Sequence, residues 1–179
     1  MKNLKRFFIA AALFTAVQAS AQTDKETTTK LVDAKNLVFN ATTAYPLASN
    51  DINAVLSKMP GGQSGNMIQL NGSQYQLIIE KDKIEAFLPY YGRAYVANRD
   101  VTDSGIKLKS SDFSYVTEKN KKGNWVISIK PKNDRDVRSM TLSITQSGYA
   151  SLSVTSNNRQ PITFNGYISE PSAKEELSK

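Results

Sequence analysis

The 179-residue sequence contains no cysteine and no histidine, and these two absences exclude whole classes of chemistry. Without cysteine the chain forms no disulfide bond and offers no thiol nucleophile or thiolate metal ligand. Without histidine it lacks the commonest general base and the commonest metal ligand. A Ser-His-Asp triad and a zinc site of the usual kind are therefore excluded. We expect no catalytic residue, no cofactor and no bound metal.

Carboxylates alone could still catalyse hydrolysis, because paired Asp or Glu residues cleave glycosides without histidine. The candidate aspartates, however, lie in or near expected turns, where such side chains ordinarily bind nearby backbone N–H groups. They are Asp100, Asp103, Asp112, Asp134 and Asp136. The segment around the last two lacks the glycine and the terminal glutamate of an EF-hand calcium loop. We therefore expect a protein that is not an enzyme, with a carboxylate-only hydrolase as the weakest alternative.

The N-terminus has the layout of a cleavable signal peptide. Basic residues precede an apolar run at 7–17, and the small-x-small pattern Ala19-Ser20-Ala21 comes before Gln22. The apolar run is shorter than the roughly 20 residues that span a bilayer, which disfavours an uncleaved anchor. No cysteine follows it for lipid attachment. We expect residues 1–21 to be removed, giving a periplasmic or secreted chain without a transmembrane segment.

Charge gives little indication of a partner. The sequence has 23 lysines and arginines against 16 aspartates and glutamates, a net charge of +7. Three of the basic residues lie in the expected signal peptide, so the mature chain keeps 20 against 16, or +4. The basic residues are scattered, and the run KNKK at 119–122 is typical of a solvated turn. We expect no nucleic-acid partner.

Beyond residue 22 the sequence consists mostly of short alternating segments separated by turn signals. A polar segment at 22–36 contains an expected short helix at 28–35, and residues 49–58 have room for one more helical turn. Hairpin turns are predicted at Asn71-Gly72, at 119–123 and at Ser147-Gly148. We predict an all-β domain at 37–169, mainly antiparallel, forming a sandwich or an open barrel. A charged tail follows at 170–179.

Trp125 is predicted to lie in the core of this domain. It begins an alternating strand and shares one face of it with Ile127 and Ile129.

The most unusual stretch is LPYYGRAY at 88–95, with three tyrosines, an arginine, a glycine and a proline. Pro89 marks a strand end or an edge, and Gly92 permits a bulge or a bend. The interpretation we favour is structural. It requires Leu88 and at least two of the three tyrosines to be largely buried, because a small domain without disulfides needs its large apolar groups in the core.

The functional interpretation of the same stretch is a binding cleft. Tyr90, Tyr91 and Tyr95 would hold an apolar or sugar-like body, and Arg93 would hold an anion. Arg159, which follows a predicted turn at Asn157-Asn158, has two interpretations as well. It either caps backbone carbonyls within a hairpin or joins Arg93 in one basic, aromatic-rimmed pocket.

Three stretches together resemble a family of small exported bacterial proteins, the domain of unknown function 4251. They are VFNATTAYP at 38–46, YQLIIEKDKIEAFLPYYGRAY at 75–95 and SLSVTSNNRQPITFNGYI at 151–168. The resemblance covers nearly the whole mature chain and implies an exported, β-rich single domain. The family has no established activity, so the resemblance implies no catalytic residue.

These observations leave two function classes. The first is a binding module for a small apolar or amphipathic ligand, held at a barrel mouth or between sheets with the tyrosines and Arg93 at the rim. The alternative is an envelope accessory or structural protein that acts through a protein partner and has no small-molecule site.

Overall fold

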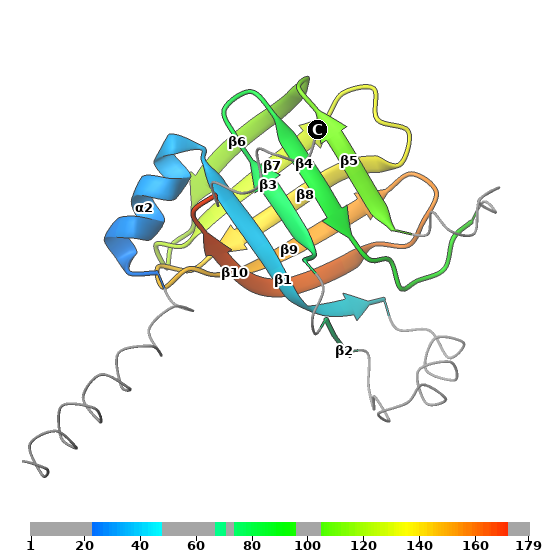
Figure 1. Cartoon of the computed structure of the whole chain (residues 1–179), viewed down its shortest axis with the longest axis horizontal. Coiled ribbons are helices and arrows are strands. Elements are labelled where there is room, and N and C mark those ends of the chain that lie inside the picture. Colours follow the sequence, from blue (N-terminus) through cyan, green and yellow to red (C-terminus); the bar gives the residue numbers. More distant parts are fainter. Residues whose placement is uncertain (1–22, 48–66, 71–73, 96–104, 172–179) are drawn as a thin grey trace, which may run out of the picture.

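The computed structural model describes residues 23–47, 67–70, 74–95 and 105–171, which form one short helix and ten strands (Figure 1). Helix α2 covers Lys25–Ala34. The first five strands are β1 (Leu37–Pro46), β2 (Ile68–Gln69), β3 (Gln76–Ile79), β4 (Ile84–Leu88) and β5 (Ile106–Ser110). The second five are β6 (Phe113–Lys119), β7 (Trp125–Pro131), β8 (Val137–Ile144), β9 (Tyr149–Ser156) and β10 (Ile162–Ser169). The all-β prediction with a short N-terminal helix is confirmed.

Four predicted features lie outside the described residues. They are the signal peptide at 1–21, the helical turn at 49–58, the turn at Asn71-Gly72 and most of the charged tail. Asp100 and Asp103 also lie outside them.

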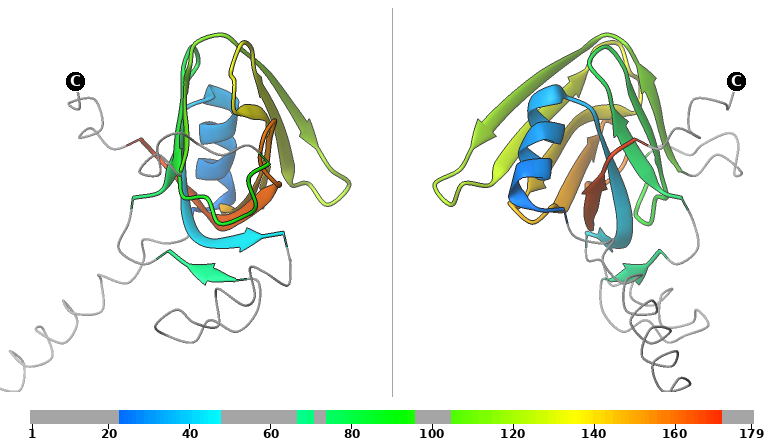
Figure 2. Two further views of the ribbon diagram at one scale, coloured as in Figure 1. Left: turned by 90° about the vertical axis from the view of Figure 1, so that its right-hand side faces the viewer. Right: turned by 60° about the vertical axis from the view of Figure 1, so that its left-hand side comes forward.

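All ten strands belong to one antiparallel sheet, in the order β5-β4-β3-β1-β10-β9-β8-β7-β6, with β2 paired to β1. Only Ser111 and Asp112 separate the two end strands, β5 and β6, in the chain. The sheet therefore curls back on itself into a nearly closed barrel (Figures 1 and 2). A seam remains where β5 and β6 do not pair. Of the two predicted architectures, the barrel is the one that forms.

The core fills the inside of this barrel with inward-facing side chains. Every strand except β6 contributes buried residues, and β6 contributes Phe113 and Tyr115, which are partly buried against the core. Trp125 is 2% exposed, and Ile127 and Ile129 on the same face of β7 are fully buried, as predicted. Phe39 of β1 and Phe164 of β10 are the other large aromatic side chains that are fully buried. Burying each such side chain stabilises the fold by roughly 1.5–3 kcal/mol, which compensates for the absence of disulfides.

Helix α2 begins and ends at identifiable caps. The carboxylate of Asp24 accepts a hydrogen bond from the backbone N–H of Thr27 at 2.8 Å, and Lys35 takes a left-handed conformation at the C-terminus. These caps place the helix at Lys25–Ala34, earlier than the predicted 28–35. Leu31 and Val32 are buried in the barrel core, so α2 covers one end of the barrel. In the left panel of Figure 2, α2 lies within the outline of the curled sheet.

Candidate functional site

Residues 88–95, which we call the strap, leave β4 at the end of the barrel opposite α2 (Figure 1). Leu88 is 1% exposed and completes the core, as predicted. The strap then pairs with the turn between β9 and β10. Ala94 forms an isolated antiparallel bridge with Arg159, and the N–H of Gln160 donates to the carbonyl of Arg93 at 3.0 Å. The strap is therefore fastened across this end of the barrel by backbone hydrogen bonds.

Tyr90 locks the bend of the strap. Its hydroxyl lies 2.9 Å from the carbonyl oxygen of Arg93 and 3.1 Å from that of Gln160, so it can donate to either. Burial raises the pKa of Tyr90 to about 12, and the hydroxyl keeps its proton at neutral pH. Gly92 lies at a bend, as predicted, and a Cβ added there would be 2.5 Å from the Tyr90 hydroxyl. Any larger side chain at this position would have to displace the Tyr90 ring.

Arg159 is the most buried cation of the sequence-predicted site, with its side chain 10% exposed. Its Nη1 donates to the carbonyl of Gly105 at 3.0 Å, and its Nε lies 3.4 Å from Oδ1 of Asp136. The guanidinium carbon lies 5.1 Å from the centroid of the Tyr90 ring, within cation–π distance. Arg159 therefore caps a backbone carbonyl, but this carbonyl belongs to Gly105, before β5, and not to its own hairpin as predicted.

The other predicted site residues are more exposed. Tyr90 and Tyr91 are partly buried and pack against the core, whereas Tyr95 is 66% exposed, so the prediction that at least two of the three tyrosines are largely buried is met in part. The physical reason is that the strap crosses the barrel end, where each ring has one side on the core and one side in solvent. Arg93 is exposed and makes no side-chain hydrogen bond or ion pair with the described residues.

The structure thus brings Tyr90 and Arg159 into direct contact, and it joins Arg93 to this pair only through its backbone. Gly105, Asp136 and Gln160 complete the cluster. The sequence patterns did not point to Gly105 or Gln160, and they marked Asp136 only as a turn aspartate. Asp134 shows why turn aspartates are poor indicators of a site. Its carboxylate accepts hydrogen bonds from the N–H groups of Asp136 and Val137 at 2.9 and 2.6 Å, which is an ordinary structural role.

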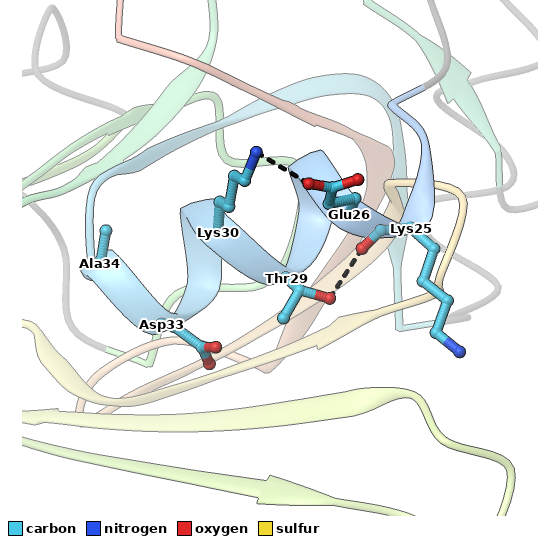
Figure 3. Close-up of a pocket in the computed structure, with 6 residues that line it drawn as sticks. All are labelled: Lys25, Glu26, Thr29, Lys30, Asp33 and Ala34. Atoms are coloured by element: carbon cyan, nitrogen blue, oxygen red, sulfur yellow. Dashed lines mark hydrogen bonds and ion pairs between the residues drawn. The ribbon is translucent and has the colours of Figure 1, made fainter.

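An open hollow of about 740 Å³ runs along the outer face of α2 (Figure 3). Its lining contains two lysines and two acidic residues, and the closest pair, Lys30 and Glu26, forms an ion pair at 3.0 Å. Thr29 donates to the carbonyl of Lys25 at 2.7 Å. The hollow thus contains one ion pair and one bond to the backbone, as is usual on a solvated helix face.

A third surface is the free edge of β6. Within the described strands β6 pairs only with β7, and Val116 to Lys119 are all exposed. In the left panel of Figure 2 the hairpin of β6 and β7 leans away from the rest of the barrel. At its base, Tyr115 is half-buried, and Nζ of Lys35 lies 4.9 Å from the centroid of its ring.

The excess positive charge of the described chain lies in β5 to β8 and the turns between them. Residues 105–144 contain nine lysines and arginines against four acidic residues, whereas the other described residues contain seven of each. Two of the nine, Lys109 and Lys132, form ion pairs with Glu85 and Asp112. The side chains of Lys121, Lys122 and Lys130 make no ion pair with the described residues.

Among the described residues, no three acidic side chains are grouped to hold a metal ion. No helix in the same part of the chain is long and apolar enough to cross a membrane. The fold and its surfaces define a class: a nearly closed antiparallel β-barrel, closed by a helix at one end and by a strap of the chain at the other.

Residues 19–168 match the domain of unknown function DUF4251, and the chain belongs to this family. The resemblance found in the three sequence stretches is thereby confirmed. A crystal structure of a DUF4251 family protein from Bacteroides eggerthii DSM 20697 is similar, with a TM-score of 0.53 at 13% sequence identity. The match covers 86% of this chain and 91% of that chain, and at this identity it shows a shared fold. No curated protein matches the sequence.

Proposed function

We propose that this protein is an exported, non-enzymatic accessory domain that acts through a protein partner, binding an extended acidic segment of that partner along β6. The observation that carries the proposal is the free edge of β6. An unpaired strand edge presents a row of N–H and C=O groups that readily accept another strand, and many recognition domains use this mode.

Charge identifies the kind of partner. The excess of basic residues at 105–144 attracts an acidic segment and repels a second copy of the same chain. Lysines also protect free edges against aggregation, which is the simpler reason for their presence here. The two explanations differ in whether an acidic strand binds.

Synthetic ten-residue peptides provide the test. One would alternate threonine with glutamate, and the other threonine with lysine. We expect the acidic peptide to bind and to slow hydrogen exchange at the amides of residues 113–119, and the basic peptide not to bind. Lys121→Glu should weaken binding about two- to fivefold, the size of one exposed ion pair. Lys81→Glu, in the turn between β3 and β4, is the matched control. Binding without protection of β6, or no binding at all, would contradict the proposal.

Export rests on the N-terminal sequence pattern. The mature protein, isolated from the periplasm or the medium of its own cells, should begin at Gln22 in an intact-mass measurement. A membrane-bound protein with the N-terminal segment still attached would overturn this part of the proposal.

A second candidate function is binding of a small apolar or amphipathic ligand at the strap. The exposed ring of Tyr95 and the exposed side chain of Arg93 favour it, together with the partly buried Tyr91. Tyr90 and Arg159 would support such a site and not contact the ligand, because both are occupied by the fold. Native mass spectrometry of protein isolated from its own compartment should then show a retained ligand that Tyr95→Ala loses.

A further inference from the structure

A hollow of about 340 Å³ opens on the outer face of β8, β9 and β10, next to the turn that joins β6 to β7. Its side-chain lining includes Asn120, Asn124, Ser143, Tyr149, Ser151 and Asn165. The volume lies near the lower limit of small-molecule sites, which span roughly 300–1,000 Å³. This surface is separate from the strap, and the turn between β6 and β7 forms part of its rim.

The register of the sheet aligns the polar side chains on its floor. Ser143 of β8 lies opposite Ser151 of β9, and Ser151 lies opposite Asn165 of β10. Neighbouring strands are about 4.8 Å apart, so the three side chains form an evenly spaced row. Neither these three nor the side chain of Asn124 makes a hydrogen bond with any described residue.

Two hairpins wall the hollow, and they are held against each other. The side-chain amide of Gln146, in the turn between β8 and β9, donates to the carbonyl of Lys122 at 3.4 Å. Gly123 has a φ of 78°, and a Cβ there would lie 2.7 Å from Nε2 of Gln146. Glycine at this position permits the close approach of the two turns.

The chemistry of the lining defines the ligand. It contains amides and hydroxyls, which both donate and accept hydrogen bonds, and no charged side chain among its described residues. The ring of Tyr149, 49% exposed, adds an aromatic surface at the edge. A ligand that matches must carry neutral groups that donate and accept, together with an apolar face. Sugar rings have both.

We propose that this hollow is a binding site for a neutral saccharide, with Ser143, Ser151, Asn124 and Asn165 as hydrogen-bonding groups and Tyr149 as the stacking surface. The proposal does not depend on the β6 edge. Serine and asparagine also occur on the solvated faces of sheets without any ligand, so the test compares the hollow with its surroundings.

The experiment is an NMR titration of the full mature chain with glucose, galactose, maltose and lactose, and with glucuronic acid as a charged comparator. The side-chain NH₂ signal of Asn124 reports on the wall of the hollow, and that of Asn165 on its floor. We expect at least one neutral sugar to give saturable shifts of these signals, and the charged comparator to bind more weakly.

Two pairs of variants distinguish binding in the hollow from binding elsewhere on the same strands. Ser151→Val and Asn165→Leu should weaken the sugar at least about tenfold, the size expected when one or two good hydrogen bonds are lost. Ser153→Val and Thr163→Val, one row further along the same face, should bind as the parent does. Melting temperatures of all four variants show whether each is folded. Absence of saturable shifts, shifts confined to the strap, or equal binding by all variants would overturn the proposal.

Discussion

The two ends of the barrel are closed by different physical means. At one end α2 is formed by local interactions and inserts apolar side chains, Leu31 and Val32, into the core. At the other end the strap is held by polar contacts between segments far apart in the sequence. The single side chain of Arg159 contacts three residues, Tyr90, Gly105 and Asp136. The comparison shows that one small domain can close its core with a local helix on one side and a long-range network on the other.

Both ends contain buried polar groups. At the strap end the charge of Arg159 is paired, whereas Oε1 of the neighbouring Gln160 is buried with no hydrogen-bond partner among the described residues. At the barrel wall beside α2, the hydroxyl of Tyr115 and the indole N–H of Trp125 are buried with no hydrogen-bond partner among the described residues. Burial raises the pKa of Tyr115. An unpaired buried group costs roughly 1–3 kcal/mol, so the apolar packing near α2 has to be correspondingly favourable.

The largest effect is expected from a variant that disrupts the apolar packing near α2. Trp125→Ala should destabilise the protein by about 3–5 kcal/mol, because it leaves a large cavity in the core. Chemical denaturation measures the change in the free energy of unfolding. Val116→Ala, at an exposed position of β6, is a suitable control and should change it by less than about 0.5 kcal/mol. If the two variants were equally stable, the packing of the α2 end would be weaker than described here.

The next largest loss of stability is expected when the contacts of Arg159 with the strap end are removed. Arg159→Met keeps much of the side-chain volume and removes the charge, leaving the Gly105 carbonyl without this donor. We expect a loss of about 2–4 kcal/mol. Arg93→Met removes an exposed arginine from the strap itself and should be nearly neutral in the same denaturation measurement. An equal loss of unfolding free energy in both variants would mean that the positive charge at this end stabilises it, and not the specific contacts of Arg159.

A smaller loss of stability is expected from a change at the bend of the strap, Gly92. Gly92→Val should cost about 1–3 kcal/mol, because its side chain would displace the Tyr90 ring. The double variant with Tyr90→Ala should cost less than the sum of the two single changes, since the ring is already gone. Strict additivity in a thermal or chemical denaturation cycle would show that Gly92 is required for a different reason.

The smallest effect concerns the Tyr90 hydroxyl. Tyr90→Phe should cost about 1 kcal/mol near neutral pH, the net value of one hydrogen bond. The pKa of Tyr90 is raised from 10.0 to about 12 in the folded protein. The stability that this hydroxyl contributes is therefore fully present below pH 10 and is lost as the pH rises through about 12. Unfolding measured between pH 9 and 12 should show a steeper loss for the parent than for the phenylalanine variant, and parallel curves would contradict this.

Several features could be predicted from the sequence because they depend on local patterns. The alternation of apolar and polar residues marks the strands, and it correctly placed Trp125, Ile127 and Ile129 on one buried face. The turn at 119–123 and the turn at Ser147-Gly148 both join neighbouring strands as predicted. The start of α2 was misplaced because its cap, Asp24, lies outside the apolar periodicity that indicated the helix.

The candidate site was only partly predictable. Within LPYYGRAY the structural interpretation is confirmed for Leu88 and for the bend at Gly92. The contacts of Arg159 with Gly105 and Asp136 join positions 54 and 23 residues away in the sequence. Such contacts follow from strand order, which a single sequence does not display.

By itself the sequence determined which segments are strands, which faces of them are apolar and which chemistries are excluded, because these depend on residue type and a period of two. Only the tertiary structure decided that the sheet closes into a barrel, that β6 keeps a free edge, and that Ser143, Ser151 and Asn165 form one row. The physical reason is that alternation assigns each side chain to a face, whereas its neighbours on that face are set by the pairing and register of strands distant in the chain.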